Sequence, residues 1–551
     1  MARVILCGLV VTLLLGCGGG GSSGSGPGPV TPAIPAPTPA PAPPDQTALT
    51  LEEAHRFLRQ ATFGPTTDAV IELRESGIEP WLNRQLFTPA TLQVPYMLSL
   101  PEPQNNFVAQ ANRVDAWFQA ALQGEDQLRQ RVAFALSQIL VVSERGALFN
   151  APYGLATYYD LLAQRAFGNY RDLLEAVTLS PAMGVYLSML GNEKPDEARN
   201  IRPDENYARE LMQLFTIGLV ELNLDGTPRL DSNGLTIPTY DQSVIEGFAH
   251  VFTGWTYGGS PRFRSPRRNF TRPMQAFADF HDTNPKRLLG GLVLPAGQTP
   301  EQDLAMALDN IFEHPNVAPF VSRQLIQKLV SANPSRAYVE RVARVFNDDG
   351  NGIRGNLGAV VRAILLDEEA RSPGQGETGG KLTEPLLRLT ALWRAFDARS
   401  EEGTYYFPSP EDAFSQAPLR APSVFNFFSP DFAPSGEIKL ASLVSPEMQI
   451  TNETTSSSVN NYLAFAIFLR NSRSANLRPR DIYLSLEDDV AFASNPSVLV
   501  QRIADKLLGG TISDELRAET EALVALWQGP DGRVMEAIHS IASSPEFAVL
   551  P

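Results

Sequence analysis

Apolar residues recur at helical spacing along most of the chain after Thr50. In residues 128–142, Val132, Leu136, Ile139 and Leu140 fall on one side of a helix. Residues 357–366 carry a second stripe of the same kind. A spacing of three and four residues between apolar positions is typical of helices that bury one face. The pattern predicts a mainly α protein, built as a large multi-helix globular body over residues 49–551.

Residues that usually begin and end helices flank these stripes. The segment 68–76 ends at Gly77, which suits the left-handed position after a helix. The spacing of a capping box, or of its near variant, occurs at Thr50 with Glu53, Thr299 with Gln302, and Ser409 with Asp412. These signals support helix starts at residues 51, 300 and 410.

Alternating patterns typical of strands are scarce. The best are residues 274–281 and 287–294, separated by the turn sequence Asp282-Thr283-Asn284-Pro285. They predict one small β-hairpin on the helical body. The Gly- and Pro-rich residues 372–380 predict a subdomain boundary.

Composition and charge exclude several classes of protein. The 551 residues are 43% hydrophobic, which is enough for a large core and excludes a wholly disordered chain. The net charge of −16, without a long Lys/Arg cluster, argues against nucleic acid as a partner. Only two cysteines are present, which excludes a disulfide framework, an iron–sulfur cluster and a cysteine-type zinc site.

The first residues have the pattern of an export signal. Arg3 precedes the apolar residues 4–15, a stretch of about 18 Å as a helix, too short for a hydrocarbon core of about 30 Å. The stretch ends in Leu14-Leu15-Gly16-Cys17, which resembles a bacterial lipobox. That resemblance implies a lipoprotein signal peptide over residues 1–16 and acylation of Cys17, which would then hold the protein on a lipid bilayer. The alternative is an ordinary signal peptide that ends in Gly-Cys.

Residues 17–48 are rich in glycine and then in proline. Such a segment cannot bury apolar area, so it predicts a disordered linker that tethers the body to the anchor. Gly18 rather than Asp follows Cys17, and resemblance to enterobacterial sorting signals then favours the outer membrane. We therefore expect an exported protein, lipid-anchored to the cell envelope at the outer membrane or the periplasmic face.

The helix that opens at Asp204 carries the strongest polar candidates. Tyr207, Leu211, Leu214, Phe215 and Gly218 predict its buried face, and Glu205, Arg209 and Glu210 share the other. In one interpretation Glu205, Arg209 and Glu210 meet His281 and Asp282 in an acid–base site, or Glu205, Glu210, His281 and Asp282 bind a divalent metal such as Zn, Mn or Fe. In the other, Arg209 centres a structural network that joins the turn to the helix.

Three other groups have weaker signals. Asn347, Asp349 and Asn351 alternate like the first ligands of a calcium loop, but Gly358 stands where a bidentate Glu is needed, so an ordinary turn is the competing interpretation. His250 lies between apolar neighbours, as packed histidines do. The cluster Phe425, Phe427, Phe428 and Phe432 predicts either a groove wall for a glycan or peptide or a loop that plugs the core.

Several segments, taken in order, resemble a bacterial family catalogued as domain of unknown function 1800. They are His55 to Gly64, Pro80-Trp81-Leu82 with Gln85-Leu86, Glu205 to Met212 followed by Leu214 to Gly218, Thr253-Gly254-Trp255, His281-Asp282 with Lys286, and Ser423 to Phe428. The resemblance covers nearly all of the chain from Leu49 onward. It implies an exported, mostly helical protein without an assigned reaction. It also implies a partner, an exported companion of sulfatase-like fold.

Three functions fit these features. The leading hypothesis is a membrane-anchored lipoprotein that acts as an extracytoplasmic binding or assembly module. The alternative is a metal-dependent hydrolase that acts on an extracytoplasmic polymer. A purely structural envelope protein is the third.

Overall fold

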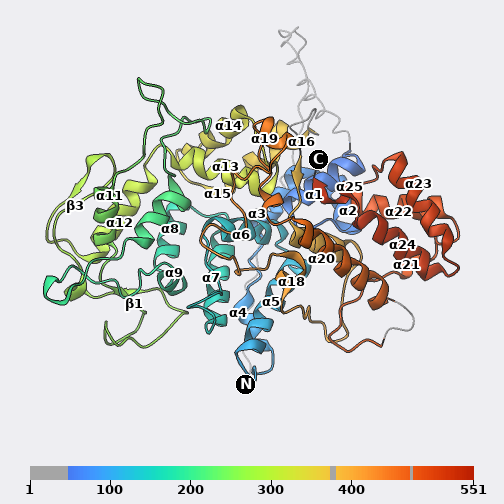
Figure 1. The fold of residues 1–551 in the computed structure, drawn as a ribbon, viewed down its shortest axis with the longest axis horizontal. Helices are drawn as coiled ribbons and strands as arrows, with labels where there is room; N and C mark the ends of the chain where they lie inside the picture. The colour runs from blue at the N-terminus through green and yellow to red at the C-terminus, as the bar shows by residue number, and fades with distance from the viewer. Residues whose placement is uncertain (1–47, 373–379, 472–475, 551) are drawn as a thin grey trace, which may run out of the picture. The chain divides into compact units, whose positions relative to one another are not determined.

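The computed structural model describes residues 48–372, 380–471 and 476–550 (Figure 1). Cys17 and the Gly/Pro-rich segment lie outside the described residues, as do residues 373–379 of the expected subdomain boundary. The chain from Ala48 onward forms one compact unit by its internal contacts. The description below concerns this unit.

The first third of the unit is entirely helical. Its helices are α1 (Leu51–Ala61), α2 (Thr67–Ser76), α3 (Ile78–Phe87), α4 (Gln93–Ser99), α5 (Asn106–Gln123), α6 (Gln127–Ile139), α7 (Pro152–Arg165), α8 (Tyr170–Thr178) and α9 (Pro181–Tyr186).

The middle third alternates short helices with two-residue strands. Its elements are the 3₁₀-helix η1 (Glu197–Arg199), α10 (Asn206–Glu210), the π-helix η2 (Leu211–Thr216), α11 (Gln242–Val251), β1 (Trp255–Thr256), β2 (Gln275–Ala276), the 3₁₀-helix η3 (Ala278–Phe280), β3 (Lys286–Arg287), the 3₁₀-helix η4 (Leu289–Gly291), β4 (Val293–Leu294) and α12 (Pro300–Phe312).

The last part returns to helices. Its elements are α13 (Val317–Leu329), α14 (Arg336–Asn347), α15 (Leu357–Leu366), α16 (Glu368–Arg371), β5 (Lys381–Leu382), α17 (Pro385–Ala395), α18 (Pro410–Phe414), α19 (Glu437–Leu440), the 3₁₀-helix η5 (Pro446–Gln449), α20 (Glu453–Ala464), the π-helix η6 (Phe465–Leu469), α21 (Glu487–Val490), α22 (Pro496–Leu508), α23 (Asp514–Leu526), α24 (Pro530–Ala542), α25 (Pro545–Ala548) and β6 (Val549–Leu550). The prediction of a mainly α body is confirmed.

Two of the three predicted capping boxes form. Thr50 with Glu53 and Thr299 with Gln302 exchange both hydrogen bonds at the starts of α1 and α12. The third prediction is wrong, because the Ser409 side chain makes no capping bond and the Asp412 N–H donates to the Ser409 carbonyl oxygen instead. Gly77 ends α2 with a positive φ of 81°, as its position after the stripe predicts.

The expected pairing of residues 274–281 with 287–294 is wrong. β2 pairs with β1, in register Trp255 with Ala276, and β3 pairs with β4. The second segment folds back on itself because Gly290 and Gly291, at φ of 64° and 76°, form a tight turn within it. A third two-stranded sheet joins β5 to β6, so three short antiparallel pairs replace the single hairpin.

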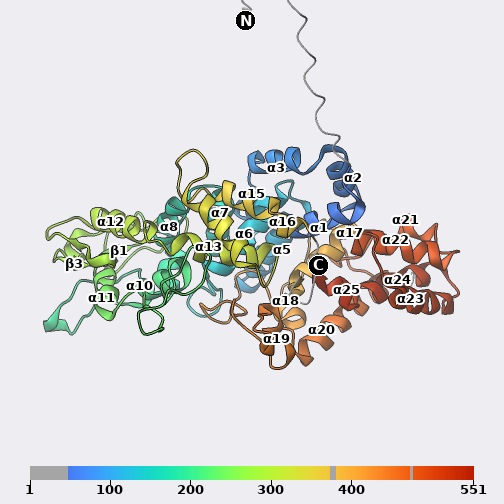
Figure 2. The ribbon, with the colours of Figure 1, turned by 90° about the horizontal axis from the view of Figure 1, so that it is seen from above.

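Helix α6 is the centre of the packing. Figures 1 and 2 agree that α5, α6 and α7 lie between α11 and α12 on one side and α22, α23 and α24 on the other. Every side chain of α6 is buried, including its polar ones. The stripe predicted in residues 128–142 is therefore confirmed, but the opposite face of the helix is also inside the protein.

Within residues 48–372, 380–471 and 476–550, no helix has both the length and the apolarity needed to cross a membrane.

Gly247 allows α11 to lie against the strand segment that contains β3. A Cβ at this position would lie 1.9 Å from the Arg287 carbonyl oxygen. Alanine would gain about 1 kcal/mol of helix propensity, but the clash with backbone forces the two elements apart. We expect Gly247→Ala to lower the free energy of unfolding by roughly 1–3 kcal/mol, seen as a lower midpoint in thermal scans. Gly529→Ala is the control, since no atom lies within 4 Å of its added Cβ; equal midpoints for the two variants would contradict the close approach.

Candidate functional site

Glu205 immediately precedes α10, and Arg209 and Glu210 are the last two residues of that helix. Asp204 accepts the Asn206 N–H at 2.8 Å, and the helix begins at Asn206. Arg209 Nη2 and Glu205 Oε2 form the expected ion pair at 3.0 Å, and Glu205 Oε1 accepts a hydrogen bond from Gln242 of α11. Glu205 and Arg209 therefore form a partly exposed ion pair at the surface.

Glu210 differs from its helix neighbours because its carboxylate is buried. Burial raises the pKa of Glu210, and the nearby Arg209 only partly opposes this effect. Within the described part of the chain, Glu210 Oε2 has no hydrogen-bond partner. Tyr207, Leu211, Phe215 and Gly218 form the buried face as predicted, whereas Leu214 is only partly buried.

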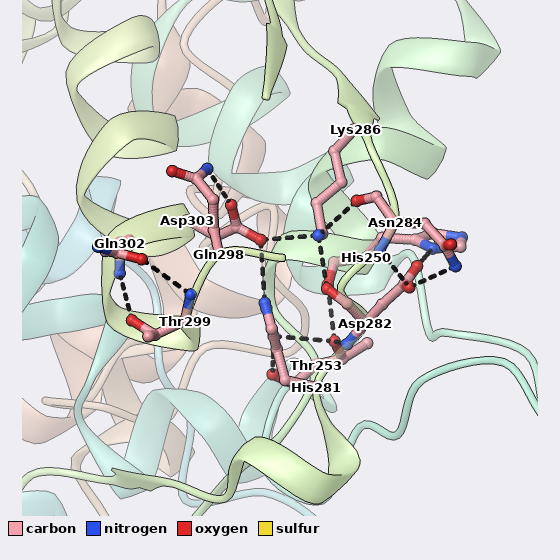
Figure 3. A network of polar contacts seen from close by, with 10 residues as sticks. All are labelled: His250, Thr253, His281, Asp282, Asn284, Lys286, Gln298, Thr299, Gln302 and Asp303. Carbon is pink, nitrogen blue, oxygen red and sulfur yellow. Dashed lines mark hydrogen bonds and ion pairs between the residues drawn. The ribbon is translucent and has the colours of Figure 1, made fainter. Parts of the chain in front are cut away.

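His281 lies in a separate and fully buried network (Figure 3). Its Nε2 is 2.9 Å from Asp303 Oδ2, and its Nδ1 is 3.0 Å from the Thr253 carbonyl oxygen. Both ring nitrogens thus lie within hydrogen-bond distance of oxygen atoms. A metal ligand needs a nitrogen lone pair that is not engaged in another contact, so this arrangement does not favour metal binding by His281.

Lys286 completes this network. Its ammonium group donates to the carbonyl oxygens of Asp282 and Asn284 at 2.5 and 2.9 Å and lies 2.7 Å from Asp303 Oδ2. Although burial alone raises the pKa of Asp303, the bonds from His281 and Lys286 lower it overall. The network fastens the 281–286 turn to the first turn of α12. It is centred on Lys286 and Asp303, not on Arg209.

Asp282 faces the other way and pairs with His250. Its Oδ2 makes a short contact with His250 Nδ1, and its Oδ1 accepts the Asn284 N–H at 3.0 Å. Burial alone raises the pKa of Asp282, but these bonds outweigh it and lower the pKa to about 2. The His250 side chain is 31% exposed, so this histidine is a surface-facing partner of Asp282 rather than a packed one.

The five sequence candidates therefore divide between two places. Glu205 and Arg209 lie at the surface beside the buried Glu210 of the same helix, and His281 and Asp282 belong to the turn network. Across the ranges that the structure describes, no group of three or more His, Cys, Asp or Glu side chains is arranged to hold a metal ion.

The calcium-like segment has the contacts of an ordinary turn. Asp349 Oδ1 accepts the Asn351 N–H at 2.9 Å, and its Oδ2 accepts from Asn356 at 2.7 Å. The Asn347 side-chain oxygen contacts the Arg354 guanidinium. A cation and a guanidinium compete for the same oxygen, so this loop supports the turn interpretation.

A cluster of buried charges that the sequence patterns did not indicate lies beside α6. Its members are Arg131 on α6, Lys328 on α13, Lys381 on β5, Glu384 before α17, and Glu447 on η5. Lys381 forms an ion pair with Glu447. Glu384 Oε2 accepts from the side-chain amides of Gln138 and Gln416 at 2.9 and 2.5 Å. Three cations thus face two carboxylates in the interior.

Lys328 is a member of this cluster without an ion-pair partner among the described residues. Its Nζ donates to Gln138 Oε1 at 3.0 Å and lies 3.9 Å above the centre of the Phe428 ring. Burial is the main reason why the pKa of Lys328 falls to about 8; Lys381 and Arg131 act in the same direction, and Glu384 and Glu447 oppose it. A buried ammonium loses its hydration shell, and one aromatic ring face and one amide oxygen replace only part of the stabilisation that water gave it.

A cavity of about 470 Å³ opens onto Lys328. Its apolar walls come from η2, the segment that follows η2, α13 and the segment after residue 423, and they include Leu214, Ile217, Val220, Phe320, Phe425 and Phe428. Phe428 is buried and Phe425 is exposed, so the phenylalanine cluster both plugs the core and lines a cavity. The size and lining are typical of a small-molecule site. In the sequence, the only hint is the phenylalanine cluster itself.

The Lys286–Asp303 network gives a stability prediction. Asp303→Asn leaves the buried Lys286 and His281 without their carboxylate, which should cost roughly 3–5 kcal/mol. Asp309→Asn, on the same helix, removes an exposed ion pair with Arg171 and should leave the unfolding midpoint nearly unchanged. Thermal unfolding of the two variants measures the difference. Equal midpoints would show that the network does not hold the 281–286 turn in place.

Comparison with protein families gives a match that covers nearly the whole unit. The model of the family described as "Protein of unknown function (DUF1800)" matches residues 56–549. Comparison with curated proteins and with solved structures finds no match. The resemblance noted in the sequence thus holds over the described helices and over both networks. The chain belongs to the DUF1800 family of proteins of unknown function.

Proposed function

We propose that this chain is an exported lipoprotein, held on the bacterial cell envelope through Cys17, whose helical body acts as a binding module. The observation that carries the binding role is the cavity beside α6, with apolar walls and a charged inner end. A purely structural protein has no use for an open cavity next to a buried ammonium, because filling it with apolar side chains would be more stabilising.

The anchor is supported by the order of segments in the sequence. A basic residue, a short apolar stretch, a lipobox-like Leu14-Leu15-Gly16-Cys17 and a Gly/Pro-rich linker precede the folded unit. A linker of this composition would keep the body at a distance from the bilayer while leaving it free to bind. We place the anchor at the outer membrane or the periplasmic face.

The alternative of a metal-dependent hydrolase has less support. The ligands in this alternative are Glu205, Glu210, His281 and Asp282. Glu205 is bonded instead to Arg209 and to Gln242 of α11, and His281 uses both ring nitrogens for other bonds. If the protein acts as an assembly module, we propose that its partner is an exported companion protein of sulfatase-like fold. Co-purification from detergent-solubilised membranes tests this partner, and a chain that elutes without one would exclude it.

Removal of the acylated cysteine tests the anchor. We expect the unaltered protein to incorporate labelled palmitate and to sediment with membranes, because acyl chains bury in the bilayer. Cys17→Ala should lose the label and leave the membrane fraction. Cys7→Ala, which changes the other cysteine, is the control and should keep both properties. A Cys17→Ala protein that still fractionates with membranes would contradict the lipoprotein proposal.

A further inference from the structure

The buried charge cluster that reaches the cavity through Lys328 carries an excess of positive charge. Arg131, Lys328 and Lys381 face Glu384 and Glu447, so the cluster holds one more cation than carboxylate. Lys381 and Glu447 compensate each other directly. The remaining carboxylate, Glu384, bonds two neutral amides at the same oxygen. The uncompensated charge therefore lies with Arg131 and Lys328, and Lys328 is the one that lines the cavity.

Several buried polar atoms in the charge cluster and in the cavity lining have no hydrogen-bond partner among the described residues. They are Arg131 Nε and Nη1, Glu384 Oε1, Glu447 Oε2, Gln324 Nε2 and Gln327 Oε1. Buried polar groups are nearly always hydrogen-bonded in folded proteins, and each exception requires a reason. Gln324 and Gln327 both line the cavity, so an occupant of the cavity would be within their reach.

The backbone conformation at Asn426 places the side-chain amide of this residue close to Lys328. Asn426 has a φ of 66°, a left-handed conformation that residues other than glycine rarely adopt. Its Nδ2 donates to Gln138 Oε1 at 3.1 Å, the same oxygen that accepts from Lys328. Gln138 thus fixes the positions of both Lys328 and Asn426.

The helix on the opposite wall is also irregular. η2 is a π-helical segment that follows α10, and its residues Gln213 and Leu214 line the cavity. π-helical turns occur frequently at functional sites, because the extra residue changes the direction in which side chains point. At the rim, Arg323 and Asp431 form an exposed ion pair at 2.9 Å between α13 and the loop after Phe428.

We propose that this cavity binds an organic carboxylate with an apolar body, with the carboxylate on Lys328 Nζ and the apolar body against the walls from η2, α13 and the Phe425–Phe428 loop. This inference rests on the proposed binding function and specifies its ligand class. One excess positive charge matches a monoanion. A phosphate dianion would need more donors than one ammonium and a few amides supply.

Octanoate, octan-1-ol and octylammonium are matched probes, since they share the chain and differ in the charge of the head group. The test uses calorimetry on the full chain with Cys17→Ser, which has no acyl group and needs no detergent. We expect octanoate to bind at one site at least tenfold more tightly than either of the other probes, since charge-assisted hydrogen bonds form only with the anion. Equal or tighter binding of octan-1-ol or octylammonium would overturn the proposal.

Variants locate the binding. Lys328→Met keeps the length of the side chain and should weaken octanoate binding at least tenfold. Lys439→Met changes the net charge equally at an exposed position and should leave binding unchanged. If Lys328→Met fails to fold, Phe425→Ala serves instead, because Phe425 is 57% exposed at the wall and its loss should weaken octanoate binding without disturbing the core. Unchanged binding in whichever of these two variants folds would overturn the assignment.

The pH dependence of octanoate binding follows from Lys328. The groups that face its ammonium are Arg131, Lys381, Glu384 and Glu447, and burial dominates their effects, so that the pKa of Lys328 is about 8. Octanoate stays ionised between pH 6 and 10. Its affinity should be constant below pH 8 and fall about tenfold per pH unit above it, as the ammonium loses its proton. A flat profile up to pH 10 would overturn the role of Lys328.

Failure of this inference can be told apart from failure of the binding function. If octan-1-ol binds in the cavity as well as octanoate does, the anion preference is overturned and the binding function stands. If none of the three probes binds up to roughly 10 mM, where binding is worth under about 3 kcal/mol, both are overturned.

Discussion

The burial of the polar face of α6 is the constraint on which the rest of the structure depends. Arg129 donates to the carbonyl oxygens of Thr88, Leu86 and Ala163, and Gln130 donates to that of Thr91. A buried cation without acceptors would cost several kcal/mol. The ends of α3 and α7 must therefore lie where their free carbonyls meet α6. The helix thus positions its neighbours through polar contacts as well as through its apolar stripe.

The same constraint is only partly satisfied at Arg131, and the cavity lies beside Gln138 and Ile139 at the C-terminal end of α6. Arg131 Nη2 donates to the Lys328 carbonyl oxygen at 2.6 Å, but its remaining donors have no partner among the described residues. Gln138, two turns further on, joins Lys328, Asn426 and Glu384 in one set of bonds. In a core that serves stability alone, these polar atoms would all be hydrogen-bonded within the protein. In a binding site, the unpaired atoms can bond to the ligand.

The sequence predicts elements well and their contacts poorly. The stripes, the caps at Thr50 and Thr299 and the end of α2 at Gly77 depend only on neighbouring residues, and all appear in the structure. The pairing of β2 with β1 depends on residues about twenty positions apart, which local patterns do not determine. For the same reason, the prediction that Glu205 and His281 lie close together is wrong. The partner of His281 is Asp303, a residue on α12 that no sequence pattern distinguishes from its neighbours.

Lys328 was missed for a different reason. Its neighbours Gln327 and Leu329 give it the appearance of an ordinary residue near the end of a helix, and only the packing of α6, η5 and the Phe425–Phe428 loop buries its charge. We infer that Lys328 is a buried cation whose charge an organic anion would compensate. Labelling the six lysines with ¹³C and titrating their Cε signals by NMR tests this claim directly. We expect the signal that is lost in Lys328→Met to titrate with a pKa of about 8, and octanoate to raise this pKa. A pKa near 10.5 that octanoate does not change would contradict the claim.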